Sequence, residues 1–313
     1  MTVTTRDIFG ASGAEPAAVG SYGESARNGR LPDAAQPGQV RLQIADMERS
    51  LEFYRQVLGL RVIAQEGGRA SLAAQGDDRL LVELNEKRSV KPVPRNGRLG
   101  LYHFAILLPD RASLGRFVRH LSESGIGAGA GDHLVSEAFY LSDPDGLGIE
   151  VYADRPRSTW RRAGRQLMMA TDPVDISDVI AAAGDTRWEG MPAGTVMGHV
   201  HLHVGGIDEA SRFYSDGIGF DRIVWSYPGA LFMSAGGYHH HLGANTWAGA
   251  HAKPAADDEA RLLEWTIVVP RVDDVNAVEQ RLAAGSHPVE RSTEGDLLTR
   301  DPWSTAVRIV AAG

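Results

Sequence analysis

Three short strings of this sequence alternate apolar residues with side chains that can bind a metal. They span residues 101–104, 148–151 and 197–201, and they carry His103, Glu150 and His199. Two imidazoles and one carboxylate form the facial triad of non-haem Fe(II) oxygenases, which leaves coordination positions open for reactants. These strings are the first reason to expect an enzyme.

The same strings predict how the side chains are oriented. Successive side chains of a β-strand point to opposite faces, so each candidate ligand faces away from its apolar neighbours. In the third string His199, His201 and His203 share one face, and the apolar residues between them share the other. We therefore expect the apolar faces to pack against helices and the polar faces to line a cavity.

Composition limits the classes of protein to consider. The chain has 313 residues, 43% of them hydrophobic and 23% charged, which is typical of a globular protein with two domains or one large one. A net charge of −8 gives no basic field for phosphate groups, so nucleic acid is not an expected partner. Because the sequence has no cysteine, nitrogen and oxygen atoms must hold any metal.

The N-terminal segment has no targeting pattern. Residues up to about Gly38 are rich in glycine, alanine, serine and proline, and they lack a basic stretch followed by an apolar one. No part of the sequence approaches the roughly 18 consecutive apolar residues that a membrane helix needs. We expect a flexible tail over residues 1–36, a cytoplasmic location and no membrane partner.

An internal repeat organises the rest of the chain. Residues 40–60 recur as residues 200–220, so that Phe53 and Tyr54 reappear as Phe213 and Tyr214. Each copy starts as an alternating strand, continues as an amphipathic helix that ends near a glycine, and goes on as further strands. The second half of each copy repeats this plan, with helices expected around residues 114–121 and 275–282. The sequence therefore predicts four similar modules.

Residues 154–194 between the copies differ in composition. The first part is rich in arginine, and residues 174–183 predict one short helix after Asp172 and Pro173. We interpret this segment as an ordered linker that joins the two halves.

The chain resembles the vicinal oxygen chelate superfamily, which includes glyoxalase I, bleomycin-resistance proteins and extradiol dioxygenases. The resemblance covers residues 37–153 and 195–313. Four strings, at residues 100–109, 132–138, 143–150 and 235–241, look like those of two-domain catechol 2,3-dioxygenases. The resemblance implies an α+β fold, in which four βαβββ modules form two curved, barrel-like sheets with helices outside. It also implies two such domains, over residues 37–153 and 195–313.

The resemblance also indicates metal positions, on the first strand of one module and on the first and last strands of its partner. If module two pairs with module three, His103, Glu150 and His199 form one complete site. Modules one and four would then form a dead site, where Arg308 could neutralise Glu83. Pairing of module one with module two stays possible, because the four residues at their family positions resemble the metal ligands of glyoxalase I. At the family positions, module one carries Gln39 and Glu83, module two carries His103 and Glu150, and module four carries Trp265 and Arg308.

Further residues match catalytic positions of extradiol dioxygenases. The resemblance implies that His241 is the acid–base group, that Tyr140 points at a substrate oxygen, and that His133 lines the pocket. Gly243 takes the place of a fourth ligand, and we expect it to leave room for substrate. Strand alternation predicts that His240 projects from the opposite face. A single strand histidine such as His203 or His239 is more simply a structural residue.

The function that this resemblance implies is ring cleavage of catechol or a substituted catechol with O2, outside the diol. The expected cofactor is Fe(II), with Mn(II) also possible. Two alternatives stay open: a glyoxalase-type metal-dependent isomerase or lyase, and a bleomycin-resistance-like protein that binds a ligand without catalysis. The family is commonly oligomeric, so we expect a homo-oligomer.

Overall fold

Four βαβββ modules make up most of the computed structural model, which describes residues 13–94 and 97–312. The first module contains β2 (Gln36–Ile44), α2 (Met47–Gln56), β3 (Arg61–Glu66), β4 (Arg69–Ala73) and β5 (Leu80–Glu86). The second contains β6 (Arg98–Leu107), α3 (Arg111–Glu123), β7 (Gly129–Asp132), β8 (Ser136–Ser142) and β9 (Gly148–Asp154). The predicted α+β class and the repeated module are confirmed in this half of the chain.

The second half repeats the plan. The third module contains β12 (Val196–His203), α5 (Ile207–Ala210) with the π-helix η2 (Ser211–Ile218), β13 (Asp221–Val224), β14 (Ala230–Ser234) and β15 (Leu242–Asn245). The fourth contains β17 (Arg261–Val269), α6 (Val272–Ala284), β18 (Val289–Arg291), β19 (Leu297–Arg300) and β20 (Ala306–Ala311). A short strand, β16 (Lys253–Pro254), runs beside β6.

The modules pair across the two halves of the chain. One sheet has the strand order β13-β14-β15-β12-β6-β9-β8-β7, so it joins modules two and three. The other has the order β18-β19-β20-β17-β2-β5-β4-β3 and joins modules one and four. The exchanged pairing is therefore the one that the structure adopts. Because each half contributes one module to each sheet, neither 37–153 nor 195–313 builds a whole sheet by itself.

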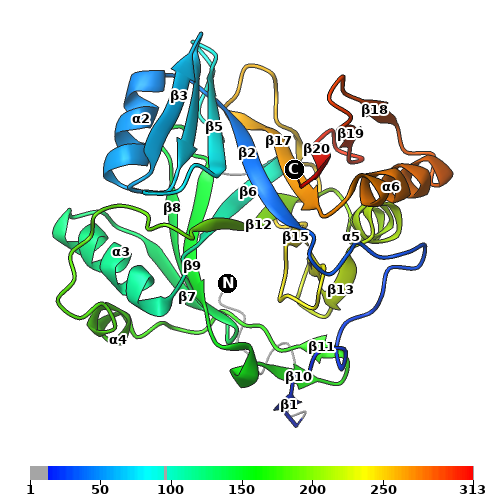
Figure 1. Cartoon of the computed structure of the whole chain (residues 1–313), viewed down its shortest axis with the longest axis horizontal. Helices are drawn as coiled ribbons and strands as arrows, with labels where there is room; N and C mark the ends of the chain where they lie inside the picture. Colours follow the sequence, from blue (N-terminus) through cyan, green and yellow to red (C-terminus); the bar gives the residue numbers. More distant parts are fainter. Residues whose placement is uncertain (1–12, 95–96, 313) are drawn as a thin grey trace.

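The helices lie on the outside of both sheets, as Figure 1 shows for α2, α3 and α6. Two of them begin at an aspartate whose side chain accepts a backbone N–H of the first turn: Asp46 accepts from Arg49 and Asp110 from Ser113. The apolar strand faces pack under these helices. One continuous core contains buried residues of all four modules.

Residues 13–36 are packed against the rest of the protein, so the predicted flexible tail is wrong for this part. Strand β1 (Glu15–Pro16) pairs with the linker, Gly23 N–H donates to the Arg165 carbonyl, and Leu31 N–H donates to the Gly219 carbonyl. Leu31 is buried in the main core. A composition rich in small residues did not reveal these backbone contacts. Residues 1–12 of the predicted tail lie outside the described residues.

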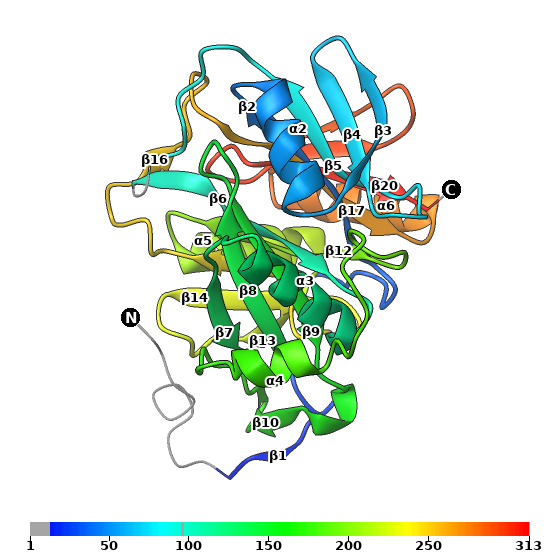
Figure 2. The same cartoon turned by 90° about the vertical axis from the view of Figure 1, so that its left-hand side faces the viewer.

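The linker contains short elements that follow the surface of the first sheet: η1 (Arg157–Thr159), β10 (Arg161–Ala163), β11 (Gln166–Leu167) and α4 (Ile176–Ala181). The helix α4 lies where the sequence predicted one, and Figure 2 shows it beside α3. The two helices approach closely at Gly115, where an added Cβ would lie 2.3 Å from the Val179 carbonyl oxygen. In the part of the chain that the structure describes, no helix is long and apolar enough to span a membrane.

Candidate metal centre and active site

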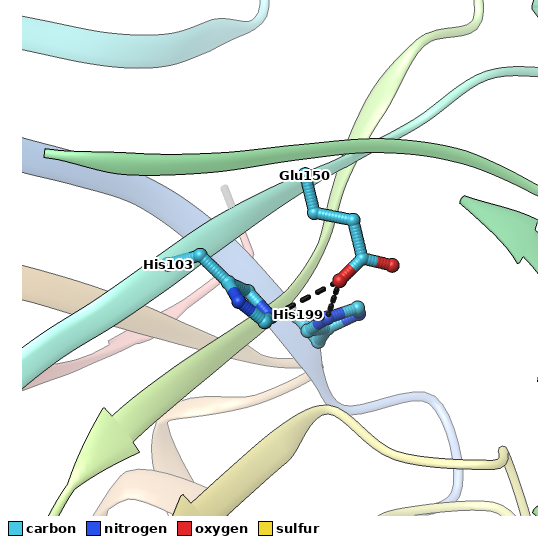
Figure 3. A group of neighbouring side chains, drawn as sticks. All are labelled: His103, Glu150 and His199. Carbon is cyan, nitrogen blue, oxygen red and sulfur yellow. Dashed lines mark hydrogen bonds and ion pairs between the residues drawn. The ribbon is translucent and has the colours of Figure 1, made fainter. Parts of the chain in front are cut away.

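Three buried side chains converge on neighbouring strands of the first sheet. His103 lies on β6, Glu150 on β9 and His199 on β12, and Figure 3 shows them pointing toward one another. The distance is 3.0 Å from His103 Nε2 to Glu150 Oε2, 3.2 Å from His199 Nε2 to the same oxygen, and 3.3 Å between the two Nε2 atoms. These are the three ligand candidates that the sequence singled out.

Strand order and register explain why they meet. The three strands are adjacent in the order β12-β6-β9. Ala105 of β6 lies opposite Glu150 on one side and opposite His199 on the other. Ala105 is completely buried, and its single methyl group leaves room above the sheet for the longer side chains around it. His103, two residues earlier, lies on the same face of β6.

The donor set and its spacing fit a divalent metal ion. An octahedral ion with bonds of about 2.1 Å places neighbouring ligand atoms about 3.0 Å apart. The three separations of 3.0, 3.2 and 3.3 Å are close to this value. Three converging ligands occupy one face of an octahedron and leave the opposite face free. His103, Glu150 and His199 can therefore hold a metal with open positions.

Burial and mutual contact set the charges of these groups. Burial alone would raise the pKa of Glu150, but the adjacent His199 and His103 hold that pKa well below its usual range. Burial lowers the pKa of His199 to about 4, although the Glu150 carboxylate opposes this change. Near neutral pH Glu150 is ionised and His199 is neutral, which are the forms that bind metals.

A cavity of about 780 Å³ opens beside His103 and Glu150. Part of its wall is aromatic, since Tyr102, Tyr227, Phe232 and Trp247 line it. Residues 169–171 of the linker cover another side. No local sequence pattern pointed to these wall residues, since they come from segments far apart along the chain.

His240 faces this cavity, whereas His241 does not. His240 lines the cavity, and its ring lies 4.0 Å, centroid to centroid, from the ring of His199. His241 instead stacks on Tyr238 and accepts the Ala235 N–H at Nδ1, at 3.2 Å. The prediction that His241 lies beside the open positions is therefore wrong.

The cause of this difference is the turn between β14 and β15. The prediction extended strand alternation to residues 239–241, but β15 begins only at Leu242. Gly236 and Gly237 both have positive φ and form the preceding turn. This glycine pair was the available signal that side chains need not alternate there.

Tyr140 and His133 also line the cavity, and their side chains contact each other. Tyr140 is on β8, directly opposite Glu150 of β9, and its Oη lies 2.5 Å from His133 Nε2. His133 Nδ1 lies 2.6 Å from the carbonyl oxygen of Ala170, which can only accept, so Nδ1 carries the proton. Burial, and then the negative charge of Glu150, raises the pKa of Tyr140 well above its usual value. The phenol is therefore protonated and donates to His133 Nε2, and its oxygen can accept a hydrogen bond from a ligand.

The position of Gly243 is filled by a neighbouring ring. An added Cβ at Gly243 would lie 2.7 Å from Cδ2 of His201. The His201 ring lines the cavity, and its Nε2 accepts from Asn245 Nδ2 at 3.0 Å. The glycine therefore makes room for His201, and the expectation that it makes room for substrate is wrong.

The second sheet differs in two details from the expected dead site. Arg308 pairs with Glu264 at 2.7 Å and with Asp296 at 3.1 Å, while Glu83 pairs with Arg41 at 3.1 Å. The prediction that Arg308 neutralises Glu83 is therefore wrong, because Arg308 neutralises Glu264 and Asp296 instead. Register also changes one assignment: Glu264 lies opposite Arg41, as His103 lies opposite His201, so Glu264 rather than Trp265 holds the position equivalent to His103.

Comparison with known proteins agrees with this geometry. The model of the Glyoxalase/Bleomycin resistance protein/Dioxygenase superfamily matches residues 36–151. A protein named catechol-2,3-dioxygenase from Bacillus subtilis (strain 168) is 47% identical over 272 residues, which cover 86% of this chain and 94% of that protein.

Solved structures share the fold at low sequence identity. A candidate dioxygenase from Bacillus subtilis subsp. subtilis str. 168 has a TM-score of 0.63 and 12% identity, covering 90% of this chain and 86% of its own. Glyoxalase I from Zea mays has a TM-score of 0.53 and 14% identity, and the match covers 89% of this chain and 92% of that chain. With the relative that matches nearly the whole chain, these findings show that the protein belongs to the glyoxalase/bleomycin resistance protein/dioxygenase superfamily.

Proposed function

We propose that the protein is an Fe(II)-dependent extradiol dioxygenase that cleaves catechol or a substituted catechol with O2. The observation that carries this proposal is the convergence of His103, Glu150 and His199 beside a cavity with a partly aromatic wall. The relative named catechol-2,3-dioxygenase supports the same reaction. Both atoms of O2 would enter the product, a muconic semialdehyde.

The three converging residues would hold the metal, Fe(II) or alternatively Mn(II). When bound, it would supply the Lewis-acid and redox chemistry that a catechol needs to react with O2. The protein's own contribution is to hold the three ligands on one face and to keep the site away from bulk water. Residues 169–171 serve this second purpose, because they close one side of the cavity.

The remaining residues would orient the diol and move its protons. His240 faces the cavity with a ring next to His199, so it can accept a proton from a catechol hydroxyl. Tyr140, whose hydroxyl donates to His133, can accept a hydrogen bond from a substrate hydroxyl. The rings of Phe232 and Trp247 offer apolar surfaces for the aromatic ring of the substrate.

The two alternative functions have less support. A glyoxalase-type isomerase would need a further ligand at the position of Gly243, and the ring of His201 fills that space. A protein that binds its ligand without a metal would have no use for a buried carboxylate that contacts two imidazoles in the geometry of metal ligands, as Glu150 does. The proposed dioxygenase uses all three groups.

Metal analysis and oxygen uptake test the proposal together. We expect the purified protein to contain about one iron per chain, and to consume oxygen with catechol while a yellow semialdehyde accumulates. Bound nickel or zinc with glyoxalase activity would favour the isomerase. Catechol binding without oxygen uptake by the iron-loaded protein would contradict the proposal.

The cavity wall indicates which catechols should react. Among the described residues that line it there is no lysine or arginine, so a carboxylate on the ring would be buried without a cationic partner. We expect kcat/KM for 3-methylcatechol to exceed that for 3,4-dihydroxybenzoate by roughly 10-fold or more. Trp247→Arg, which places a cation in the wall, should narrow this difference. Equal rates for the two substrates with the unchanged protein would contradict it.

Homo-oligomeric assembly stays a prediction. Light scattering of the purified protein would test it directly.

A further inference from the structure

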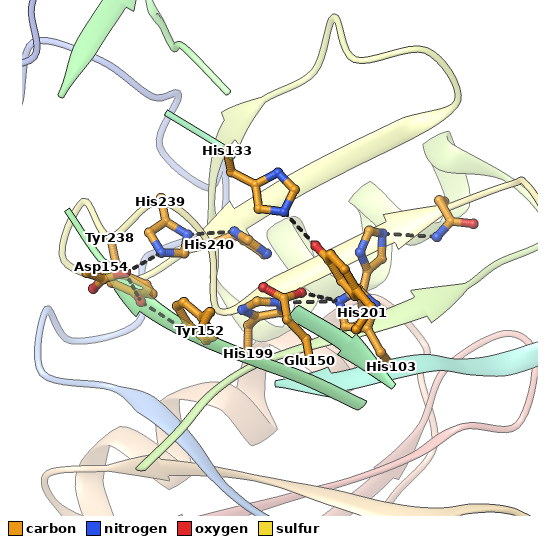
Figure 4. Close-up of polar contacts among 12 residues, drawn as sticks. His103, His133, Glu150, Tyr152, Asp154, His199, His201, Tyr238, His239 and His240 are labelled. Atoms are coloured by element: carbon orange, nitrogen blue, oxygen red, sulfur yellow. Dashed lines mark hydrogen bonds and ion pairs between the residues drawn. The ribbon is translucent and has the colours of Figure 1, made fainter. Parts of the chain in front are cut away.

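A chain of polar contacts runs from Asp154 to the cavity. Asp154 Oδ1 lies 2.9 Å from His239 Nε2, and His239 Nδ1 lies 2.7 Å from His240 Nδ1. Figure 4 shows these residues in line, ending at the His240 ring. His239 is completely buried, and Asp154 lies at the end of β9, four residues after Glu150.

With His239 neutral, hydrogen-bonding rules fix the proton positions along this chain. The Asp154 carboxylate only accepts, so His239 Nε2 must carry the proton of that contact. A neutral imidazole has one N–H, so His239 Nδ1 is an acceptor and His240 Nδ1 must be the donor. In neutral His240 the other nitrogen, Nε2, is then left with a free lone pair.

The His240 ring is held so that this lone pair faces the cavity. The ring lies between His199, at a centroid distance of 4.0 Å, and Phe232, at 5.0 Å. Its Nδ1 is directed at His239, so Nε2 lies on the far side of the ring. Figure 4 shows that nitrogen directed at the space between His133 and Glu150.

We propose that Asp154 and His239 are positioning residues, which hold His240 in the tautomer that presents an unprotonated Nε2 to the substrate. This inference rests on the proposed function, in which His240 accepts a proton from the diol. In that step the O–H bond of the catechol breaks and an N–H bond forms at Nε2. His240 becomes an imidazolium that still donates from Nδ1 to His239, and the Asp154 carboxylate stabilises the positive charge through His239.

Two tyrosines near this chain provide a control. Tyr238 Oη donates to the same Asp154 oxygen at 3.1 Å, and Tyr152 Oη lies 2.8 Å from Tyr238 Oη. Neither hydroxyl contacts His239 or His240 in the described hydrogen bonds. Tyr238→Phe therefore removes both of these hydrogen bonds but leaves the Asp154–His239–His240 chain intact.

The test compares two substitutions of His239. His239→Phe keeps an aromatic ring beside Trp160 and Tyr238 but removes the acceptor for His240 Nδ1–H. His239→Asn can place its side-chain oxygen near the position of Nδ1 and so restores that acceptor. We expect His239→Phe to lower kcat by roughly 10- to 100-fold, less than the roughly 10²–10⁴-fold contribution of a whole acid–base group. KM and metal content should stay within about twofold, and His239→Asn should recover most of kcat.

A direct measurement of the tautomer does not depend on turnover. In the full chain labelled with ¹⁵N-histidine and loaded with diamagnetic Zn²⁺, two-bond ¹H–¹⁵N spectra distinguish Nδ1–H from Nε2–H. We expect the Nδ1–H form at His240 in the unchanged protein and in Tyr238→Phe, and a shift toward Nε2–H in His239→Phe. Asp154→Ala, at a partly exposed site, should give the same shift even if His239→Phe does not fold.

The outcomes separate this inference from the proposed function. Wild-type kcat in His239→Phe, or an Nε2–H tautomer in the unchanged protein, would overturn the positioning role while leaving ring cleavage in place. If the unchanged, metal-loaded protein does not cleave catechol, the proposed function fails. The tautomer spectra would still decide whether Asp154 and His239 orient His240.

Discussion

The two sheets have the same architecture but carry different ionisable side chains at equivalent positions. In the first sheet His201 lies opposite His103, and in the second Arg41 lies opposite Glu264. Similarly, the last strand of module two carries Glu150, where the last strand of module four carries Arg308. One sheet therefore presents imidazoles around a carboxylate, and the other presents guanidinium groups around carboxylates.

This difference shows how the same fold can either hold a metal or exclude one. A neutral imidazole keeps a lone pair for a metal, whereas a guanidinium has five N–H donors and no acceptor. In the second sheet Arg308 bonds Glu264 through two nitrogens, at 2.7 and 3.1 Å, and Arg41 lies 3.6 Å from the same carboxylate. The carboxylate that a metal would need is already neutralised.

Removal of a ligand in the first sheet should have the largest effect. His103→Ala, Glu150→Ala and His199→Ala should each abolish bound iron and turnover, because each removes one of the three bonds to the ion. Far-UV circular dichroism should show an unchanged fold, and metal analysis would measure the loss. The matched change Glu264→Gln in the second sheet should leave iron content and turnover unchanged. Stoichiometric iron in any of the three alanine variants would contradict the assignment.

The paired substitutions His240→Phe and His241→Phe should have the next largest effect. His240→Phe should keep iron and lower turnover by roughly 10²–10⁴-fold, the range for a general acid–base group. His241→Phe should change turnover by less than about threefold, because His241 packs on Tyr238 away from the cavity. Oxygen uptake with catechol measures both. A loss of turnover in His241→Phe with normal turnover in His240→Phe would exchange the two roles and restore strand alternation through residues 239–241.

Local patterns predicted most of the fold. The strand and helix periodicities, and the recurrence of Phe53 and Tyr54 as Phe213 and Tyr214, indicated four βαβββ modules because such patterns depend on neighbours in the chain. Module pairing depends on contacts between distant segments. The sequence indicated it only because one of the two pairings gathers two histidines and one carboxylate at a single site.

The site predictions failed where the strand was irregular. Side chains on regular strands, such as His103 and Glu150, lie where alternation places them. His240 was missed because residues 236–241 form a turn, and Glu264 was confused with Trp265 because β17 has register shifts on both sides of them. A one-residue slip moves a side chain to the opposite face. The sequence pattern alone does not show such bulges.

Substitution in the second sheet should change stability rather than activity. Glu264→Ala leaves Arg41 and Arg308 without their shared carboxylate, and loss of one partner of a buried ion pair costs about 3–5 kcal/mol. The two arginine side chains are 26% and 21% exposed, so water offsets part of this cost. We therefore expect the free energy of unfolding to fall by about 2–3 kcal/mol. Urea denaturation would measure it. Arg291→Ala, which breaks the more exposed pair between Arg291 of β18 and Glu279 of α6, should cost less than about 1 kcal/mol.

The smallest expected effect is a pH dependence that arises in the first sheet. Burial lowers the pKa of His199 to about 4, below its value of 6.5 in the unfolded chain. Between these values the unfolded state binds a proton that the folded state does not, so the metal-free protein should lose stability as pH falls from about 6.5 to about 4. The contribution of His199 should be on the order of 1–3 kcal/mol.

Urea denaturation of the metal-free protein at several pH values would measure this loss. His199→Phe should make the decline shallower, because phenylalanine takes up no proton. An equal slope in His199→Phe and the unchanged protein would show that His199 does not produce the pH dependence. Since His199 is also a proposed ligand, added metal should steepen the decline, because protons then compete with the ion for the same nitrogen.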